Sequence, residues 1–438
     1  MKRLITQHRA PKHRQELGQT IALVAVAMVS VLAMAALAID LTTLYVAHGE
    51  IQRAADASAL AGAKAFVDSG VTTSPSNPSL QTLAQTMAGD FATAVVSQNH
   101  VAGAPAQFIN GTPLVNLTFS ASGNPNAPGN PRITVSLRRT DLPLFFARIW
   151  GNSIASVSAT AMAEAYNPAY SKTNTGAFIP SAPQCVKPFL VPNDDQNQPG
   201  VRFVNATSGA ISVAPEPFIG EKLTLSSACG VQPGCNPTNP PAAGQYLPML
   251  LPDIHRYCPG VSAPSCSGFG SSFQGSTQCC DGTPFDYQQC GVSGTIATWD
   301  PNTNPGGRNG PAQEGLECLI HDPQQDTLNP SFANSGLLQI QAGPYSQATH
   351  NVAPGSLIST SDSIITVPLF DVPNTWPPAG QQVNIVGFLQ LFVASVGPGR
   401  TDMTAYILNV VGCGSSPNPG SAVSGGGASA IPVRLIHG

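Results

Sequence analysis

The side chains of this sequence that could do chemistry are mainly thiols, and their pattern favours cross-links. The 438-residue chain has ten cysteines, an even number, all within its second part. They are Cys185, Cys229, Cys235, Cys258, Cys266, Cys279, Cys280, Cys290, Cys318 and Cys413. Because an even set in a polar, loop-rich region is typical of disulfides, we predict that each is a disulfide partner. The adjacent Cys279 and Cys280 are expected to bond to two different cysteines, and spacing does not give the connectivity.

Zinc binding is the alternative use of these cysteines. His255 with Cys258 and Cys318 with His321 each give a pair at ligand-like spacing. Zinc sites built on cysteine commonly contain a C-x-x-C pair, however, and the sequence has none. Disulfides are therefore favoured over a metal centre.

No motif in the sequence points to catalysis or to a cofactor. The chain lacks the phosphate-binding patterns G-x-x-x-x-G-K-[ST] and G-x-G-x-x-G, the G-x-S-x-G elbow of hydrolases and the H-E-x-x-H of zinc proteases. The acidic pair Asp194-Asp195 lies in the turn-like string VPNDDQNQPG, which is typical of a loop and, less often, of calcium ligands. We therefore predict no enzyme, no cofactor, no metal site and no small-molecule substrate.

Composition excludes several classes of protein. Charged residues make up 10% of the chain, against about 25% in an ordinary soluble domain. The net charge is −4, and no basic block lies outside the N-terminus. Because phosphate neutralisation needs clustered Lys and Arg, nucleic acid is not an expected partner. An apolar content of 42% also separates the chain from a disordered acidic tail.

The first forty residues predict a membrane anchor. Residues 1–18 form a basic tail, and the following segment Thr20–Ile39 carries no charge. At a rise of ~1.5 Å per residue this segment spans ~30 Å, the hydrocarbon thickness of a bilayer. Positive charge before the span predicts a cytoplasmic N-terminus and an exported remainder. The alternative is a signal peptide cleaved after Ala38, but such peptides usually have an apolar run of only about 7–15 residues.

The helical pattern continues beyond the span, so we predict one transmembrane and stalk helix over residues 19–68. There is no proline from Leu41 to Phe66. One side of this stretch carries Leu41, Leu44, Tyr45, Ile51, Ala55, Ala59, Ala63 and Phe66. Its small side chains allow another backbone to approach closely. Two coverings of this face are open: the protein's own folded region, which is favoured, or a partner subunit.

The order of residues along this helix resembles one known family. The pieces that carry the resemblance are Asp40, Leu44-Tyr45, Ile51-Gln52, Ala54-Ala55-Asp56-Ala57 and Ala59-Leu60-Ala61-Gly62-Ala63. With the basic tail and the alanine-rich span, they resemble the TadG-like N-terminal region of Tad (tight adherence, or Flp) pilus-assembly proteins of bacteria. The resemblance marks Asp40, Tyr45, Gln52, Ala55, Asp56, Ala59, Gly62 and Ala63 as family-motif or packing residues.

Two features of the wider family are missing. Pilins of the broader group are cut after a glycine and carry glutamate five residues later, whereas the fifth residue after Gly18 is Leu23. Some TadG-like proteins carry a von Willebrand A-type metal site on D-x-S-x-S, a pattern that the string from Asp56 to Leu60 does not complete. Neither prepilin processing nor a metal-dependent adhesion site is therefore expected.

Beyond residue 68 the sequence predicts an α+β ectodomain in two parts. The expected segments are a small α+β head over 69–165, a linker over 166–182, a larger disulfide-linked β-rich ectodomain over 183–415, and a Gly/Ser-rich tail with a terminal strand over 416–438. Helices are expected at 80–97 and 142–150. Strands are expected at 113–120, 133–137, 153–165, 201–204, 223–225, 337–341, 364–369, 383–393, 404–411 and 431–436, the last one pairing within the chain by default.

These features together predict a non-enzymatic, single-pass protein of the inner membrane with a periplasmic or extracellular bulk. By resemblance, it is a structural or assembly component of a Tad (Flp) pilus or of a related envelope secretion system. Its expected partners are the lipid bilayer, through residues 20–39, and other pilus-assembly subunits. The alternative is a surface adhesin or ligand-binding ectodomain without a pilus role.

Overall fold

The computed structural model of the chain confirms the α+β class. It describes residues 16–117, 130–147, 151, 154–167, 181–230, 234–250, 271–280, 285, 296–306, 310–329, 340–358, 360–397, 402–412, 423–424 and 429–436. Two compact units emerge from the tertiary contacts. The first unit comprises Met1–Ala55, Val96–Gly111 and Ser136–Thr160, and the second comprises Asp56–Val95, Thr112–Val135 and Ala161–Gly438. The domain boundaries expected from the sequence stay a prediction.

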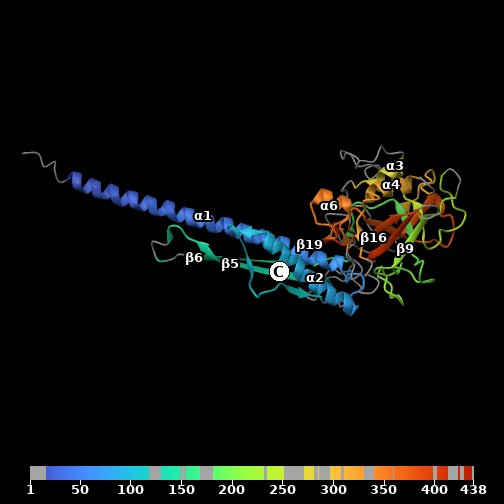
Figure 1. Ribbon diagram of the computed structural model, residues 1–438, viewed down its shortest axis with the longest axis horizontal. Coiled ribbons are helices and arrows are strands. Elements are labelled where there is room, and N and C mark those ends of the chain that lie inside the picture. The colour runs from blue at the N-terminus through green and yellow to red at the C-terminus, as the bar shows by residue number, and fades with distance from the viewer. Residues whose placement is uncertain are drawn as a thin grey trace, which may run out of the picture. The chain divides into compact units, whose positions relative to one another are not determined.

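Helix α1 (Glu16–Asp68) is a single helix of 53 residues, drawn as a continuous ribbon in Figure 1. It is rich in alanine and leucine, which favour helix, and contains no proline to interrupt its hydrogen bonds. The hydroxyls of Ser30, Thr42 and Thr43 donate to carbonyl oxygens four residues earlier, which satisfies these polar groups within the helix. The predicted continuation of the apolar segment into a stalk helix is confirmed.

Burial changes along α1. Most apolar side chains between Ile21 and Val46 are exposed, among them Leu32 at 65%. From Ala47 onward one side of the helix is buried, beginning with Ala47 and Ile51. By length and composition, α1 is the helix in the described part of the chain that could cross a membrane.

The rest of the first unit consists of short strands and parts of two long ones. These are β1 (His100–Val101), β2 (Ala104–Pro105), β3 (Gln107–Phe108), and parts of β5 (Arg132–Pro143) and β6 (Ile154–Ala165). The β1–β2 turn uses positive φ at Ala102 (49°) and Gly103 (86°), a geometry that suits a tight hairpin. The Thr160 hydroxyl of β6 donates to the Ser136 hydroxyl of β5 at 3.0 Å. The helix predicted at 142–150 is wrong at its start, because β5 continues through Pro143, and residues 148–150 lie outside the described residues.

The second unit contains a helix and two short strands near its beginning and end in sequence. They are α2 (Pro78–Gln98), β4 (Leu114–Asn116) and β19 (Val433–Ile436). The Asn77 side chain accepts the backbone N–H groups of Ser79 and Leu80 and so caps α2. The strand order is β19-β6-β5-β3, and β4 also pairs with β5. Because Val433 lies opposite Ala165 of β6, the terminal strand pairs within the chain.

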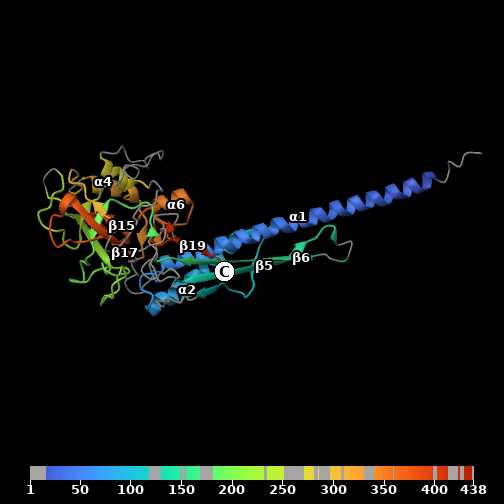
Figure 2. The ribbon, with the colours of Figure 1, turned by 180° about the vertical axis from the view of Figure 1, so that it is seen from behind.

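Six strands of the second unit close into a barrel. They are β8 (Phe189–Pro192), β9 (Lys222–Ser227), β10 (Gln245–Pro248), β15 (Ile364–Asp371), β16 (Gln382–Val396) and β17 (Met403–Gly412). The order is β16-β15-β8-β10-β9-β17, and β17 pairs again with β16. Figure 2 shows β15 and β17 in this region from behind. Each of the six strands therefore has a hydrogen-bonded neighbour on both sides, although β8, β9 and β10 cover only part of the longer strands.

One hydrophobic cluster fills the core of this barrel region. Phe189 contacts Tyr246 and Phe273 edge-on, with ring centroids 4.9 Å and 5.5 Å away. Helices α3 (Ser272–Gln278) and α4 (Pro311–Ile320) lie side by side (Figure 1) and contribute to the cluster. Gly315 permits their approach, because a Cβ there would lie 2.9 Å from the Thr277 Cβ.

The remaining elements are short. They are β7 (Ser181–Ala182), β11 (Ile296–Thr298), β12 (Thr327–Leu328), β13 (Ile340–Gln341), α6 (Pro344–His350), β14 (Leu357–Ile358), the 3-10 helix η3 (Ala379–Gln381) and β18 (Val423–Ser424). The strand predicted at 201–204 is wrong: Val204 forms only an isolated bridge with Ile211. The Asn193 side chain takes both backbone groups of Val204, accepting its N–H at 2.9 Å and donating to its oxygen at 2.6 Å. That amide replaces the ladder that a strand would need.

Disulfides occur in the second unit, as predicted. Within the described residues, Cys185 bonds to Cys280 and Cys229 bonds to Cys235. Since Cys280 pairs with Cys185, the adjacent Cys279, which is also disulfide-bonded, has a different partner. The candidates outside the described residues are Cys258, Cys266, Cys290 and Cys413.

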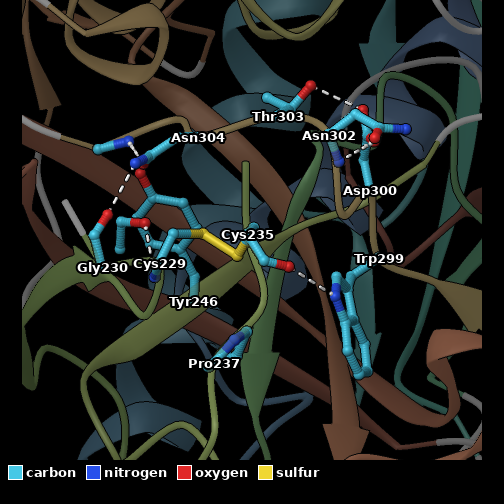
Figure 3. Close-up of a disulfide and its surroundings, with 12 residues drawn as sticks. Cys229, Gly230, Cys235, Pro237, Tyr246, Trp299, Asp300, Asn302, Thr303 and Asn304 are labelled. Atoms are coloured by element: carbon cyan, nitrogen blue, oxygen red, sulfur yellow. Dashed lines mark hydrogen bonds between the residues drawn. A yellow bond between two sulfur atoms is a disulfide. The ribbon is translucent and has the colours of Figure 1, made fainter. Parts of the chain in front are cut away.

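The short Cys229–Cys235 cross-link closes a loop that a tryptophan helps to hold (Figure 3). The Trp299 indole N–H donates to the Cys235 carbonyl oxygen at 3.1 Å. Trp376 stacks on Trp299 with ring centroids 5.1 Å apart. The disulfide and the indole hydrogen bond therefore both hold Cys235 in place.

Gly62 gives a test of the packing between α1 and its neighbours. A Cβ at Gly62 would lie 2.3 Å from the Ile133 Cδ1 and 3.2 Å from the Ala88 carbonyl oxygen. We expect Gly62→Val to lower the free energy of unfolding by about 1–3 kcal/mol through overpacking. Denaturant unfolding of the full-length protein in detergent measures the change.

Gly89 on α2 supplies the matched control, because a Cβ there meets nothing within 4 Å. Gly89→Ala is expected to raise the free energy of unfolding by up to about 1 kcal/mol, the helix-propensity gain of alanine over glycine. Wild-type stability of the Gly62→Val variant would show that the close approach does not exist.

Candidate functional site

The carboxylate of Asp40 holds the chain segment that follows β5 against α1. Its Oδ1 accepts the backbone N–H of Phe145 at 2.9 Å, and its Oδ2 accepts those of Phe146 at 3.0 Å and Ala147 at 2.7 Å. Asp40 directly follows the uncharged Thr20–Ile39 segment and is only 3% exposed. Hydrogen bonds from consecutive N–H groups to a charged acceptor are stronger than those between neutral groups. Asp40, marked by family resemblance alone, is therefore a clamp between helix and loop.

These hydrogen bonds also set the protonation state of Asp40. Burial by itself would raise the pKa of the carboxyl group, but the bonds from the N–H groups of Ala147, Phe145 and Phe146 outweigh it. The pKa of Asp40 is therefore lowered from its ordinary value. At neutral pH the group is a carboxylate and accepts all three bonds.

Glu50 makes a second connection of α1 within the first unit. Its Oε2 accepts the backbone N–H of Ala102 in the β1–β2 turn at 2.7 Å. Arg139 of β5 holds the same hairpin by donating to the carbonyl oxygens of Val101 at 2.6 Å and Ala104 at 2.7 Å. The hairpin is thus attached to both the helix and the sheet.

An open groove of about 500 Å³ lies along α1 beside this hairpin. It is lined by Ala38, Ile39, Thr42, Thr43, Val46, Ala47, Glu50 and Ala102. Most of these side chains are small or apolar, so the groove is suited to contact with an apolar surface.

The small residues of the predicted packing face are buried in the chain itself. Ala55, Ala59 and Ala63 are fully buried, and at Gly62 the backbone of α1 approaches Ile133 of β5 and the backbone of α2. At this point the face is covered by the protein's own folded region, the favoured of the two predicted coverings.

The N-terminal end of the predicted packing face is exposed, unlike the part that contains the alanines. Tyr45 is 78% exposed and Leu41 is 65% exposed, whereas Gln52 and Asp56 are half-buried. The described chain leaves Leu41 and Tyr45 uncovered, so at this end of the face a covering by a partner subunit stays a prediction. Helical periodicity places residues on a common side, but it does not show where along the helix the covering elements end.

A buried polar node connects the end of α1 to the barrel in the second unit. The Nδ2 of Asn409 on β17 donates to the Val67 carbonyl oxygen at 3.0 Å and to the Gln390 Oε1 of β16 at 2.8 Å. Its Oδ1 accepts the hydroxyls of Thr72 and Thr73, each at 3.2 Å. Every hydrogen-bonding position of this 1%-exposed amide is used. The node fixes the helix end on β16 and β17.

Two further contacts extend the node along β17. The Thr73 hydroxyl oxygen accepts the Val410 N–H at 2.9 Å. The Nδ2 of Asn167, just after β6, donates to the carbonyl oxygens of Thr72 at 2.9 Å and Val410 at 3.2 Å. The segments around residues 72, 167 and 410 are therefore joined by one network.

The side chain of Glu164 in β6 binds a side chain of β19, the last strand of the chain. It is 2% exposed and accepts hydrogen bonds from Arg434 at 2.7 and 2.9 Å and from Arg132 at 3.2 Å. The Arg434 guanidinium also lies 4.9 Å from the centroid of the Tyr166 ring. Two arginines thus satisfy one buried carboxylate, and β19 is held by side chains as well as by its backbone.

Sequence reasoning missed Asn409, Glu164 and the two threonines. Asn409 leaves a signal, because it is a single amide within the apolar string YILNVVG. Such a residue in a buried strand must find partners inside the protein. The identity of the partners is not visible in the sequence.

The residues weighed as zinc ligands are used otherwise or lie outside the described residues. Cys318 is disulfide-bonded, and the His321 Nε2 lies 3.0 Å from an Asp362 oxygen. His255 and Cys258 are not among the described residues. Within the described ranges, no group of three or more His, Cys, Asp or Glu side chains is placed to hold a metal ion.

Fold and helix together define a class: a chain with one N-terminal apolar helix that fits a single-pass membrane anchor, followed by an α+β region with disulfides. Residues 18–65 match the family described as putative Flp pilus-assembly TadE/G-like. Residues 18–65 therefore form a TadE/G-like region, and this match supports a Tad/Flp pilus-associated role. No curated protein and no solved structure matches the chain.

Asn409 is expected to control the attachment of α1 to the barrel. In Asn409→Leu the groups around it lose their shared partner, and we expect the free energy of unfolding to fall by about 1–3 kcal/mol. Denaturant unfolding of the full-length protein in detergent measures this change. The control is Thr86→Ala, an exposed hydroxyl on α2, which should stay within about 0.5 kcal/mol of wild type. Equal stability of the two variants would contradict the node.

The Asp40 clamp is expected to depend on pH. Since the folded pKa of Asp40 is lowered, its stabilising contribution is complete above the ordinary aspartate pKa of about 3.9 and is lost as the pH falls through the lowered value. Hydrogen exchange of the amides of residues 145–147, corrected for the intrinsic effect of pH, should show protection that disappears over that acidic range.

In Asp40→Asn the same amides should exchange faster at neutral pH, because one charged oxygen acceptor is replaced by an amide nitrogen. Asp56→Asn, at a half-buried position on the same helix, serves as the control. Unchanged protection of residues 145–147 in Asp40→Asn would count against the clamp.

Proposed function

We propose that this protein is a single-pass component of Tad (Flp) pilus assembly, anchored in the bacterial inner membrane by residues 20–39. The observation that carries the proposal is the match of residues 18–65 to the TadE/G-like family, on a helix whose apolar side chains are exposed over its first half. The basic tail favours a cytoplasmic N-terminus and an exported α+β region. Disulfides in the second unit support an oxidising compartment such as the periplasm.

The role proposed is structural and non-enzymatic. Asp40 fixes a strand end to α1 directly beyond the proposed span, and Asn409 fixes the barrel to the end of the same helix. Through each of these connections, the part of α1 beyond the proposed span holds a folded segment of the chain in a fixed position. A support of this kind suits a subunit that presents an ectodomain to other assembly proteins.

Partner subunits are proposed to meet the exposed stretch of α1 beyond the span. Leu41, Tyr45 and Val46 are each at least half exposed, and Val46 also lines the groove beside the β1–β2 hairpin. The alanines further along are buried within the chain, so they do not serve this contact. Apolar side chains left uncovered outside a bilayer favour association with another protein surface.

The decisive experiment combines topology with pilus formation in the native host. Carbonate should leave the wild-type protein in the membrane, and protease should digest residues beyond 40 only after the outer envelope is opened. In a deletion strain, wild type should restore pili. A chain whose Thr20–Ile39 segment is replaced by a cleavable signal peptide should be exported, with its disulfides formed, but should fail to restore them.

A chain with the same segment replaced by a leucine–alanine span of equal length is the control for anchoring alone. Normal pili in the deletion strain, with loss of attachment only, would overturn the assembly role and support the adhesin alternative. Release of the full-length wild-type protein by carbonate would overturn the anchor.

A further inference from the structure

The end of the sheet at which β5 passes into β6 leaves apolar side chains uncovered. Phe145, just after β5, is 61% exposed, and Ile154, the first residue of β6, is 63% exposed. Because β5 and β6 are neighbours in their sheet, both side chains belong to one end of it, here called the β5–β6 tip (residues 144–147 and 154). The stretch from Leu142 to Ile154 contains a single charged residue. An exposed apolar end of this kind marks a contact with a membrane or with another protein.

The contacts of β5 show that the chain runs along α1 toward the apolar segment. Arg139 of β5 holds the β1–β2 hairpin, to which Glu50 of α1 also binds. Farther along, the backbone N–H of Phe145 donates to Asp40 at 2.9 Å. Asp40 lies about 15 Å closer along the helix axis to the uncharged Thr20–Ile39 segment than Glu50 does. The β5–β6 tip is therefore the part of this sheet that lies nearest to the proposed span.

The hydrogen bonds of Asp40 set the level of the β5–β6 tip relative to a bilayer. The uncharged Thr20–Ile39 segment fills a hydrocarbon core of about 30 Å, and the headgroups add about 5–7 Å on each side. Asp40 directly follows this segment, and its carboxylate accepts the N–H groups of Phe145, Phe146 and Ala147. The backbone of the tip is therefore held at the level of the headgroups.

We propose that the β5–β6 tip docks on the membrane surface, with the Phe145 and Ile154 side chains inserted between lipid headgroups and the adjoining acyl carbons. The inference rests on the proposed anchor, because the span brings the tip to the bilayer. Apolar side chains are stable at this boundary, where they contact acyl carbons. The N–H groups of residues 145–147 need no water there, since Asp40 accepts them.

Lipid suits the tip better than a protein partner does, because the exposed apolar surface continues from the span. Leu37 and Ile39 at the end of the span are 59% and 50% exposed. A bilayer that covers these two side chains reaches the level of Phe145. The charged side chain of Asp141 precedes the tip, is 71% exposed and pairs with Arg139, which suits the water side of the boundary. With both α1 and the tip in contact with lipid, the first unit has a restricted tilt on the membrane.

Spin labels on the full-length protein test the docking, in nanodiscs of phosphatidylethanolamine and phosphatidylglycerol. Nitroxides at Phe145→Cys and Ile154→Cys should collide more often with O₂, and severalfold less often with a water-soluble nickel chelate, than a control nitroxide at Ile109→Cys. Ile109 is also an exposed apolar residue of the first unit, but its N–H donates to the Ser136 oxygen, about 30 Å along β5 from the tip. A nitroxide at Leu32→Cys reports on the anchor, and wild type treated in the same way corrects for native thiols.

The labels separate failure of the docking from failure of the anchor. Nickel access at Phe145 and Ile154 equal to that at Ile109, with the Leu32 label in lipid, would overturn the docking and leave the anchor intact. Nickel access at Leu32 would overturn the anchor and the docking together. Spin–spin broadening between chains, with low collision rates for both reagents at Phe145, would show that a second copy covers the tip and would also overturn the docking.

A polar side chain at Phe145 gives an independent test. In Phe145→Gln the tip loses its aromatic ring without gaining a charge beside Asp40, so nickel access to a label at Ile154 should rise severalfold toward that at Ile109. The matched control Ile109→Gln should leave the Ile154 label in lipid. An unchanged Ile154 label in Phe145→Gln would contradict the insertion of Phe145. If Phe145→Gln fails to fold, the Ile154 and Ile109 labels in the otherwise wild-type chain still decide the proposal.

Discussion

The structure depends on how one unbroken helix changes its surroundings near residue 40. Before that point the side chains of α1 are apolar and exposed, and after residue 47 one side is buried. A helix satisfies its own backbone groups, so it can cross lipid, but it carries a folded region only where side chains attach that region to it. Asp40 is the first charged residue after the uncharged segment, and its carboxylate receives three backbone N–H groups from the chain beyond β5.

The second attachment, at the end of α1, uses the neutral amide of Asn409 instead of a carboxylate. Asn409 is 1% exposed among apolar strand residues, where an unpaired charge would be costly and a neutral amide can be fully satisfied. Its net contribution to stability is modest, because each hydrogen bond replaces one to water. The Asn409 amide instead fixes orientation, because its hydrogen bonds to Val67, Thr72 and Thr73 fit only one placement of the helix end on β17.

The elements that local pattern determines were predicted well, and those that depend on distant pairing were not. Helix α1 and the long strands β15, β16 and β17 follow from continuous apolar runs. Barrel closure depends on pairings between segments far apart in the sequence, which no local pattern encodes. The error at 201–204 has the same origin, because the Asn193 side chain takes the backbone bonds of Val204. Asp40 was identified by resemblance, yet its partners 105 to 107 residues away were not.

Several of the few charged residues of this chain are buried between secondary-structure elements, where they connect one element to another. Asp40 joins helix to loop, Glu164 joins the last strand to its sheet through two arginines, and Arg139 holds a hairpin. Each of these groups is buried and has its hydrogen-bonding partners, so each acts as a positional constraint.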